Sequence, residues 1–399
     1  MYRDATSSPR GGTRPEERSM RKPLAALAML ASASLVLAAC AMPADDPNFI
    51  AGGSVDGTSD GGATANDAQA VVDQYLVAPT SIGVDTPLAA PPKPGALIVG
   101  LSDGTDEGKA LDASMEAAAK ALGWTYKTVD GAGTPDGAVA AFDKALALKP
   151  AGIHIDGSYV DYLTDGLAKA TTDGVPVVCT ACLGDPIDAL KDTSIVGKLE
   201  VDDWGKAVAS YIQVNSAQDA VLELFAYGTG APAEFDQGLQ SALLQYCEPC
   251  STTENLIDLT DTTVVPADSV STAMQLDPLV NWASFAPGAL SAYLGDALTA
   301  AGIDAATVKV VGWAPTAENI KATAAGTEAA WLGYPVPVVG WRVIDQFARI
   351  LGGEEIVVAP LPVQLLTADN AAAAAVDAKG NYIGVADYEA QFKALWGVK

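Results

Sequence analysis

Residues 96–101 have the sequence ALIVGL, a continuous apolar run that is typical of a strand buried on both faces of a sheet. Residues 106–122 then carry apolar side chains at helical spacing, and a second strand pattern begins at Thr125. This alternation of buried strand and helix continues to about residue 366. It predicts an α/β fold class, with parallel sheets and right-handed crossovers.

About ten strands are expected, and they divide better into two sheets than into one. The expected strands are 96–101, 125–129, 151–155, 175–179, 220–225, 254–259, 280–284, 308–311, 329–332 and 362–366. The break between the two series falls near residues 198–203 (KLEVDD). We therefore expect two α/β lobes with a cleft between them.

Composition excludes several classes of function. Of 399 residues, 49% are hydrophobic and 18% charged, which indicates a globular chain with a substantial core. The formal net charge of −26 argues against nucleic acid as a partner, because a phosphate binder needs clustered Lys and Arg. With His154 as the only histidine, a Ser–His–Asp triad or a multi-histidine metal site is disfavoured. We therefore expect no catalytic residues, no metal and no cofactor.

The N-terminus has the pattern of an export signal. Arg21 and Lys22 precede the apolar run 24–37, which is too short to span a bilayer comfortably. The run ends in LAAC, residues 37–40, which resembles the lipobox of bacterial lipoproteins. The resemblance implies that residues 1–39 are a signal peptide and that Cys40 is acylated; the alternative is a cleaved signal with an incidental cysteine. Met20 is an alternative start of the chain. Residues 40–95 would then form a flexible tether followed by a proline-rich lead-in.

The order of several segments after the tether resembles a known family. These segments are PPKPGALIVGLSDG, GWTYKTVDG, KPAGIHIDG, DGVPVV, VVGW and YPVPVVGWRVIDQFARILGGE. Over about residues 90–370 the chain resembles the type I periplasmic binding proteins, in their ribose-binding-like branch. The resemblance implies two Rossmann-like lobes joined by three crossovers, near 199–204, 332–336 and 363–368. Lobe one would comprise 96–200 plus 334–363, lobe two 203–332 plus 364–372, and 373–399 would be a C-terminal extension.

The function that this resemblance implies is solute capture outside the cytoplasm. A lipid-anchored, monomeric protein would bind a small, carbohydrate-like ligand in the cleft and deliver it to an ABC permease without acting as an enzyme. One alternative is a sensory lipoprotein that signals to a membrane receptor. Another is a non-sugar ligand, such as a nucleoside or an aromatic metabolite.

Ligands of open α/β sheets bind beyond the carboxyl ends of the strands. The expected ligand-binding residues at those ends are Asp103, Thr105, Asp156, Thr180, Phe235, Trp282, Trp313 and Tyr334. The chain departs from the ribose-binding pattern, because Thr180, Ala181, Phe235 and Ala314 stand where that pattern has charged residues. The pocket is therefore expected to be more aromatic and less charged. Each aromatic residue could instead be part of the core, and Asp103 and Asp106 could only cap the following helix.

Two C-x-x-C pairs are present, Cys179 with Cys182 and Cys247 with Cys250. In an exported protein such pairs favour local disulfides over metal or redox chemistry. Free thiols are the alternative. The fold expectation separates the two pairs too widely for them to share one metal ion.

Overall fold

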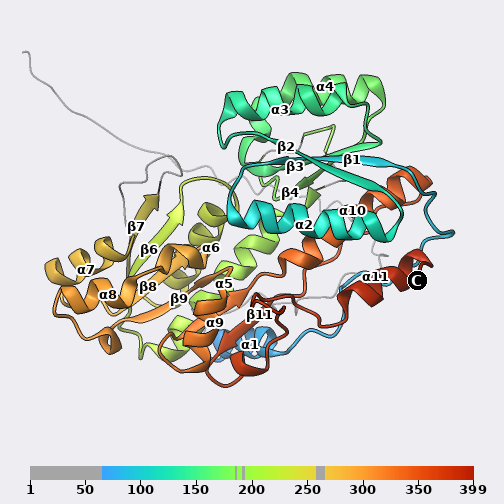
Figure 1. The fold of residues 1–399 in the computed structure, drawn as a ribbon. Coiled ribbons are helices and arrows are strands. Elements are labelled where there is room, and N and C mark those ends of the chain that lie inside the picture. The colour runs from blue at the N-terminus through green and yellow to red at the C-terminus, as the bar shows by residue number, and fades with distance from the viewer. Residues whose placement is uncertain (1–64, 185–186, 191–193, 258–265) are drawn as a thin grey trace, which may run out of the picture. The chain divides into compact units, whose positions relative to one another are not determined.

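The computed structural model describes residues 65–184, 187–190, 194–257 and 266–399. The expected signal peptide, Cys40 and the tether before residue 65 lie outside the described residues. No helix among the described residues is long and apolar enough to cross a membrane. The described chain forms two sheets with helices packed against both faces of each (Figure 1).

Sheet one contains five parallel strands in the order β2-β1-β3-β4-β5. The strands are β1 (Leu97–Ser102), β2 (Thr125–Asp130), β3 (Gly152–Asp156), β4 (Val177–Thr180) and β5 (Ser194–Ile195). One face carries α3 (Pro135–Ala147) and α4 (Thr164–Asp173). The opposite face carries α2 (Asp106–Ala121) and α10 (Val336–Gly352), as Figure 1 shows.

Sheet two contains six strands in the order β11-β10-β9-β8-β6-β7, and only β11 is antiparallel. The strands are β6 (Val221–Tyr227), β7 (Ser251–Ile257), β8 (Trp282–Ala286), β9 (Lys309–Trp313), β10 (Ala330–Gly333) and β11 (Gln364–Thr367). The helices of this part are α1 (Ala65–Leu76), α5 (Lys198–Asn215), α6 (Gly230–Tyr246), α7 (Pro266–Leu276), α8 (Leu294–Ala300) and α9 (Ala317–Ala324). The expected α/β class with two mostly parallel sheets is confirmed.

One hydrophobic core runs through both lobes. It joins the face of sheet one under α2 and α10 to the face of sheet two under α5 and α6. The far faces have separate cores, one under α3 and α4 and one under α7 and α8. Burial of this continuous apolar surface is the main term that favours the folded state.

The expected break at residues 198–203 falls at the start of α5, which follows the last strand of sheet one and packs on α6, β9 and β10 of sheet two. Helix α5 packs closely on α6, where a Cβ on Gly205 would lie 2.4 Å from the carbonyl oxygen of Phe235. The glycine therefore lets the two helix backbones approach each other. The chain therefore passes from sheet one to lobe two between β5 and α5, and α5 is buried over much of its surface.

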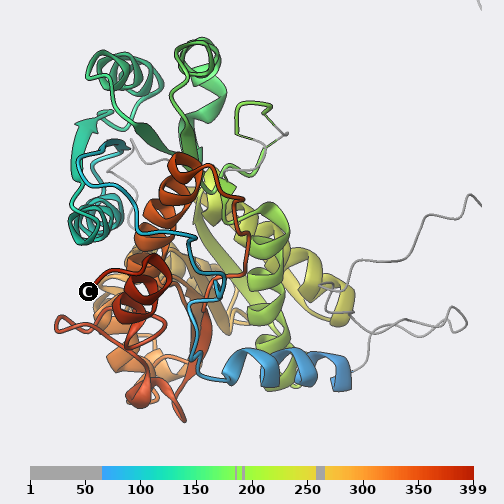
Figure 2. The same cartoon turned by 90° about the vertical axis from the view of Figure 1, so that its right-hand side faces the viewer.

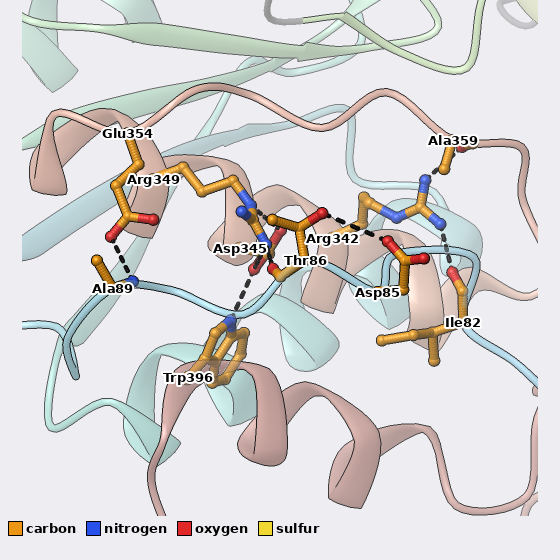
Figure 3. Close-up of polar contacts among 10 residues, drawn as sticks. All are labelled: Ile82, Asp85, Thr86, Ala89, Arg342, Asp345, Arg349, Glu354, Ala359 and Trp396. Carbon is orange, nitrogen blue, oxygen red and sulfur yellow. Dashed lines mark hydrogen bonds and ion pairs between the residues drawn. The ribbon is translucent and has the colours of Figure 1, made fainter. Parts of the chain in front are cut away.

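The proline-rich lead-in is held by buried side chains of α10. Arg342 donates hydrogen bonds to the carbonyl oxygens of Ile82 and Ala359, and Arg349 donates to that of Thr86 (Figure 3). Before the lead-in, α1 packs on α5 of the other lobe, and Figure 2 shows the lead-in running from α1 past α10. The segment therefore contacts both lobes before β1 begins.

The C-terminal residues end in α11 (Tyr388–Trp396), which packs on α10. The ring of Trp396 stacks on that of Trp341 at 5.2 Å between centroids, and its Nε1 donates to Asp345 Oδ1 at 2.8 Å. Asp345 also pairs with Arg349, with 2.8 Å between Oδ2 and Nε. The expected C-terminal extension thus completes the surface of lobe one at α10.

Candidate ligand-binding site

Four aromatic residues of sheet two and its helices form one cluster at the carboxyl ends of the strands. Trp313, the last residue of β9, lies 5.0 Å from Tyr334, 5.9 Å from Trp204 and 6.0 Å from Phe235 between ring centroids. All four side chains are buried. The structure thus brings together three of the predicted residues, and Trp204 joins them from α5. All four belong to the hydrophobic core shared by the two lobes, and Tyr334, at 9% exposed, is the one that solvent reaches most.

Two polar atoms of this cluster have no hydrogen-bond partner among the described residues. The indole Nε1 of Trp313 is buried and unpaired. Tyr334 is 9% exposed, and its hydroxyl makes no hydrogen bond within the described chain, but it is not among the fully buried unpaired atoms, so solvent reaches it. The Trp313 N–H is therefore a buried donor without a partner, which is uncommon in native proteins. These two atoms are therefore the groups that a ligand at this position can satisfy.

Lobe one contributes carboxylates to the same place. Glu107 lies in the first turn of α2, directly after β1, and Asp156 ends β3. The pKa of Glu107 is raised to about 7, first by desolvation and then by repulsion from Asp156 and Asp103. Yet solvent reaches the Glu107 side chain.

Electrostatic coupling shows that these carboxylates face lobe two. Glu107 and Asp103 raise the pKa of Tyr227, which ends β6, after the larger effect of its burial. Glu107 and Asp156 act in the same direction on Tyr334, whose pKa is raised mainly by burial. The charges after β1 and at the end of β3 therefore act on tyrosines that end β6 and follow β10 in the other lobe.

Asp103 and Thr105 shape the loop before α2. The Asp103 carboxylate accepts hydrogen bonds from the backbone N and from the hydroxyl of Thr105, at 2.9 and 2.8 Å. Thr105 is the N-cap of α2, and its Oγ1 accepts from Gly108 N. The alternative in which Asp103 caps α2 is wrong, because Thr105 is the cap and Asp103 binds Thr105. Both residues fix the backbone that presents Glu107.

The Thr180 side chain makes a hydrogen bond inside lobe one. Its side chain is buried and lies 2.9 Å from Nε2 of His154, which is also buried. Burial lowers the pKa of His154 to about 3, so the imidazole is neutral. The histidine is therefore a core residue, and the Thr180 hydroxyl is occupied by it.

The expected position of Trp282 is wrong. β8 begins at Trp282 and ends at Ala286, so the tryptophan lies at the amino end of the strand. Its ring packs against Tyr211 and lies under the ammonium group of Lys309. The sequence pattern placed this strand two residues too early, at 280–284. Trp282 therefore belongs to the opposite end of sheet two from the aromatic cluster.

A small cavity of about 20 Å³ lies beside the carboxylates in lobe one. Asp103 and Asp156 line it together with Tyr159, whose hydroxyl donates to the carbonyl oxygen of Gly133 at 2.7 Å. This volume has room for about one water molecule. Among the described residues no group of three His, Cys, Asp or Glu side chains is placed to hold a metal ion.

The sequence analysis did not predict three residues of the candidate site. Glu107 has the position of an ordinary acidic residue in a helix first turn, which the helix dipole favours without any ligand. Tyr227 ends a strand that was expected to stop at residue 225. Trp204 lies in α5, which the sequence analysis did not predict. Position was the available signal for two of them, since Tyr227 ends β6 and Glu107 lies in the first turn of the helix after β1.

Comparison with protein-family models matches residues 102–355 to the periplasmic binding protein domain. A comparison with curated proteins found no match. Many solved structures share the fold. A 5-methylthioribose transporter solute-binding protein from Thermotoga lettingae, in complex with 5-methylthioribose, is 18% identical with a TM-score of 0.62, covering 78% of this chain and 99% of that one. An ABC transporter solute-binding protein from Agrobacterium vitis with bound allitol is 19% identical, with a TM-score of 0.61 and coverage of 70% and 97%.

A third structure is the periplasmic binding component of the arabinose ABC transporter from Shewanella sp. ANA-3, bound to L-arabinofuranose. It is 16% identical, with a TM-score of 0.58, and covers 75% of this chain and 97% of that one. At these identities the solved structures establish the two-lobed fold. The match to the family model covers more than half of the chain, and the chain therefore belongs to the periplasmic binding protein domain family.

Proposed function

We propose that this protein is an extracytoplasmic solute-binding protein that captures a small molecule between its lobes and delivers it to an ABC importer. The observation that carries the proposal is the convergence of unpartnered polar groups from both lobes. Glu107 comes from lobe one, Tyr227 from lobe two, and Tyr334 from the segment between β10 and α10. A ligand that bridges them stabilises the arrangement in which the lobes face each other.

A carbohydrate-like ligand is the first expectation. The similar solved structures hold allitol, 5-methylthioribose and arabinofuranose. In this chain Trp313 and Tyr334 supply aromatic faces for C–H groups, and Asp156 and Glu107 supply acceptors for hydroxyls. Phe235 packs behind Trp313 and supports its ring. The second candidate is a nucleoside or aromatic metabolite, which the size of the aromatic cluster favours.

The remaining assignments follow from the same proposal. Residues 1–39 would be removed, and an acylated Cys40 would anchor the protein outside the cytoplasmic membrane as a monomer. The lobes would comprise 96–200 plus 334–363 and 203–332 plus 364–372. A sensory role, in which the closed form signals to a membrane receptor, uses the same binding step. We propose no catalysis, since capture and docking make and break no covalent bond.

A thermal-shift screen tests the proposal. The full chain in mild detergent is screened against ribose, arabinose, allitol, 5-methylthioribose, adenosine and tyrosine. Binding to the native state raises the melting temperature by mass action. A shift with one polyol class supports carbohydrate capture, and a shift with adenosine or tyrosine alone favours the second candidate. A flat response across polyols, nucleosides and aromatic compounds would count against solute capture.

A further inference from the structure

The first helix of the described chain is anchored on lobe two. α1 packs on α5 and on β11, and its Ala68 and Val72 side chains, one helical turn apart, are both buried. Val72 belongs to the hydrophobic core that the two lobes share. At the end of the helix, the carbonyl oxygen of Leu76 accepts a hydrogen bond at 3.1 Å from Nε2 of Gln364, the first residue of β11. α1 is therefore part of lobe two.

The residues that follow α1 are anchored on lobe one instead. The carbonyl oxygen of Ile82 accepts from Arg342 of α10 at 2.5 Å, and the Ile82 backbone N donates to Gln391 Oε1 of α11 at 3.1 Å. The carbonyl oxygen of Thr86 accepts from Arg349 of α10 at 2.7 Å (Figure 3). The Ile82 side chain is 1% exposed, so this anchor also buries apolar surface. Because α10 packs on α2 and on strands of sheet one, the second anchor belongs to lobe one.

A short stretch, residues 77–81, separates the two anchors. Even fully extended, the chain from Leu76 to Ile82 spans at most about 22 Å. Pro79 fixes one backbone dihedral of this stretch, and the carbonyl oxygen of Thr80 already accepts from Gln391 Nε2 at 3.0 Å. The part that makes no hydrogen bond to either lobe within the described chain is therefore reduced to residues 77–79.

The same stretch of chain lies against one of the crossings between the lobes. The segment from α10 to β11 contains Pro360, whose carbonyl oxygen would lie 2.8 Å from a Cβ on Gly83, a residue with a φ of +82°. Glycine therefore permits both this backbone conformation and the close approach. Arg342 donates to the carbonyl oxygens of Ile82 and Ala359, one in each segment. The two segments are thus bound to one arginine at a place where the chain passes from lobe one to lobe two.

We propose that residues 65–89 form an interlobe strap, a connection that limits how far the two lobes separate. Between β1 and β11 the chain passes between the sheets three times, from β5 to α5, from β10 to α10 and from α10 to β11. The strap adds a connection outside this stretch, before residues 102–355, which match the family model. Separation of the lobes must extend residues 77–79 or take buried carbonyl groups from their donors, and buried groups without partners are unfavourable. The free protein should therefore occupy a narrow range of interlobe distances, whatever solute it captures.

Interlobe distances in the full chain test the strap without any ligand. Nitroxide labels at Asp143→Cys on α3 and Asp296→Cys on α8, both exposed positions, report the distance between the lobes by pulsed electron double resonance. A Cys40→Ser background and labelling without reduction restrict the labels to these two positions, because the structure joins the other cysteines in disulfides. We expect one narrow distribution of distances.

Lengthening and cutting the strap should both widen this distribution. A flexible insertion of about six residues that contains a thrombin site, placed between the exposed residues Val77 and Ala78, adds roughly 13 Å of slack. We expect the intact insertion to broaden the distribution and to move its mean to longer distance by several ångströms, and cleavage of the folded protein to broaden it further. The same insertion between the exposed residues Ala90 and Pro91 is the matched control. It lengthens the chain after the lobe-one anchor, so it should leave the distribution unchanged before and after cleavage.

The comparison before and after cleavage keeps the test decisive even if an insertion slows folding, because each folded sample is compared with itself. If neither lengthening nor cutting after Val77 changes the distribution, or if the insertion after Ala90 widens it equally, the strap is overturned. A change confined to the insertion after Val77 supports it. Since no solute is added, failure of the strap leaves solute capture standing, and failure of solute capture leaves the strap standing.

Discussion

The guanidinium group of Arg342 donates a hydrogen bond at 2.5 Å to the carbonyl oxygen of Ile82, a residue 260 positions earlier in the chain. The same side chain donates to the carbonyl oxygen of Ala359, in the segment that leads to β11 (Figure 3). It also donates to that of Pro360. Glu200 at the start of α5 acts on Arg342 and accepts from Leu361 N. The lead-in, α5 and the return to β11 therefore meet at one buried arginine.

Replacing Arg342 by Met should destabilise the protein by about 3 kcal/mol. The change leaves the carbonyl oxygens of Ile82 and Ala359 without donors and Glu200 without its cation, and such losses in a buried network cost a few kcal/mol. Urea unfolding of the full chain measures the effect. Lys144→Met on the exposed face of α3 is the control and should change stability by less than about 0.5 kcal/mol. A loss equal to that of the control would show that the Arg342 contacts do not contribute.

The pattern of the strands was predictable from sequence, because each strand of a parallel sheet is buried on both faces and forms an apolar run. All ten expected strands exist, and the largest shifts are those of β7, expected at 254–259 and found at 251–257, and of β8, expected at 280–284 and found at 282–286. The short β5 was missed because a strand of two residues is too short to show an apolar pattern in the sequence. Helix α5 was missed because residues such as Trp204, Val208 and Ile212 bury most of its circumference, which removes the amphipathic stripe.

The sequence predicted that candidate residues lie at the carboxyl edge of the sheets, but it did not predict which side chains contact one another there. Trp313 and Tyr334 end or follow strands, and the sequence pattern placed them correctly. Whether a hydroxyl is free depends on its neighbours in space, which the sequence does not give. Thr180 and His154 are 26 residues apart and pair across adjacent strands, so Thr180 is occupied.

The imidazole of His154 should stay neutral far into the acidic range. Burial lowers its pKa to about 3, below the value of about 6.5 for an unfolded chain. Between these values only the unfolded state binds the proton, so this group's contribution to stability is complete above about pH 6.5 and is lost as the pH falls towards 3. Because it is the only histidine, one pair of ¹⁵N imidazole signals reports it. A midpoint between pH 6 and 7 in the folded protein would contradict the burial, and the urea-unfolded chain is the control.

The four cysteines of the two C-x-x-C pairs should be unreactive towards thiol reagents without reduction. The structure joins Cys179 to Cys182 and Cys247 to Cys250, with Cα atoms 6.0 and 5.3 Å apart. In a Cys40→Ser variant unfolded in guanidinium, we expect no free thiol before reduction and four after it. Each short loop should contribute about 2 kcal/mol to stability. Two or four free thiols before reduction would instead support the alternative that the pairs are not bridged.

Replacing Trp313 by Phe should weaken solute binding with only a modest loss of stability. The change removes the unpaired buried Nε1 and keeps an aromatic ring between Phe235 and Tyr334. Trp313→Ala would confound the result, because truncating a buried tryptophan costs about 3–5 kcal/mol of stability. The measurement is the affinity for whichever solute gives the largest thermal shift, with an expected loss of about tenfold if the N–H donates to the ligand.

Trp331→Phe is the matched control for this measurement. Trp331 is also buried in sheet two, but its Nε1 donates to Glu328 at 2.6 Å and its ring packs in the core under α7 and α8. It should therefore lose stability without losing affinity. If Trp313→Phe and Trp331→Phe reduce affinity equally, the effect arises from a general loosening of sheet two, and the indole of Trp313 is a core residue. If only Trp313→Phe does so, the unpaired N–H belongs to the ligand site, because the two changes remove the same atoms at the same depth.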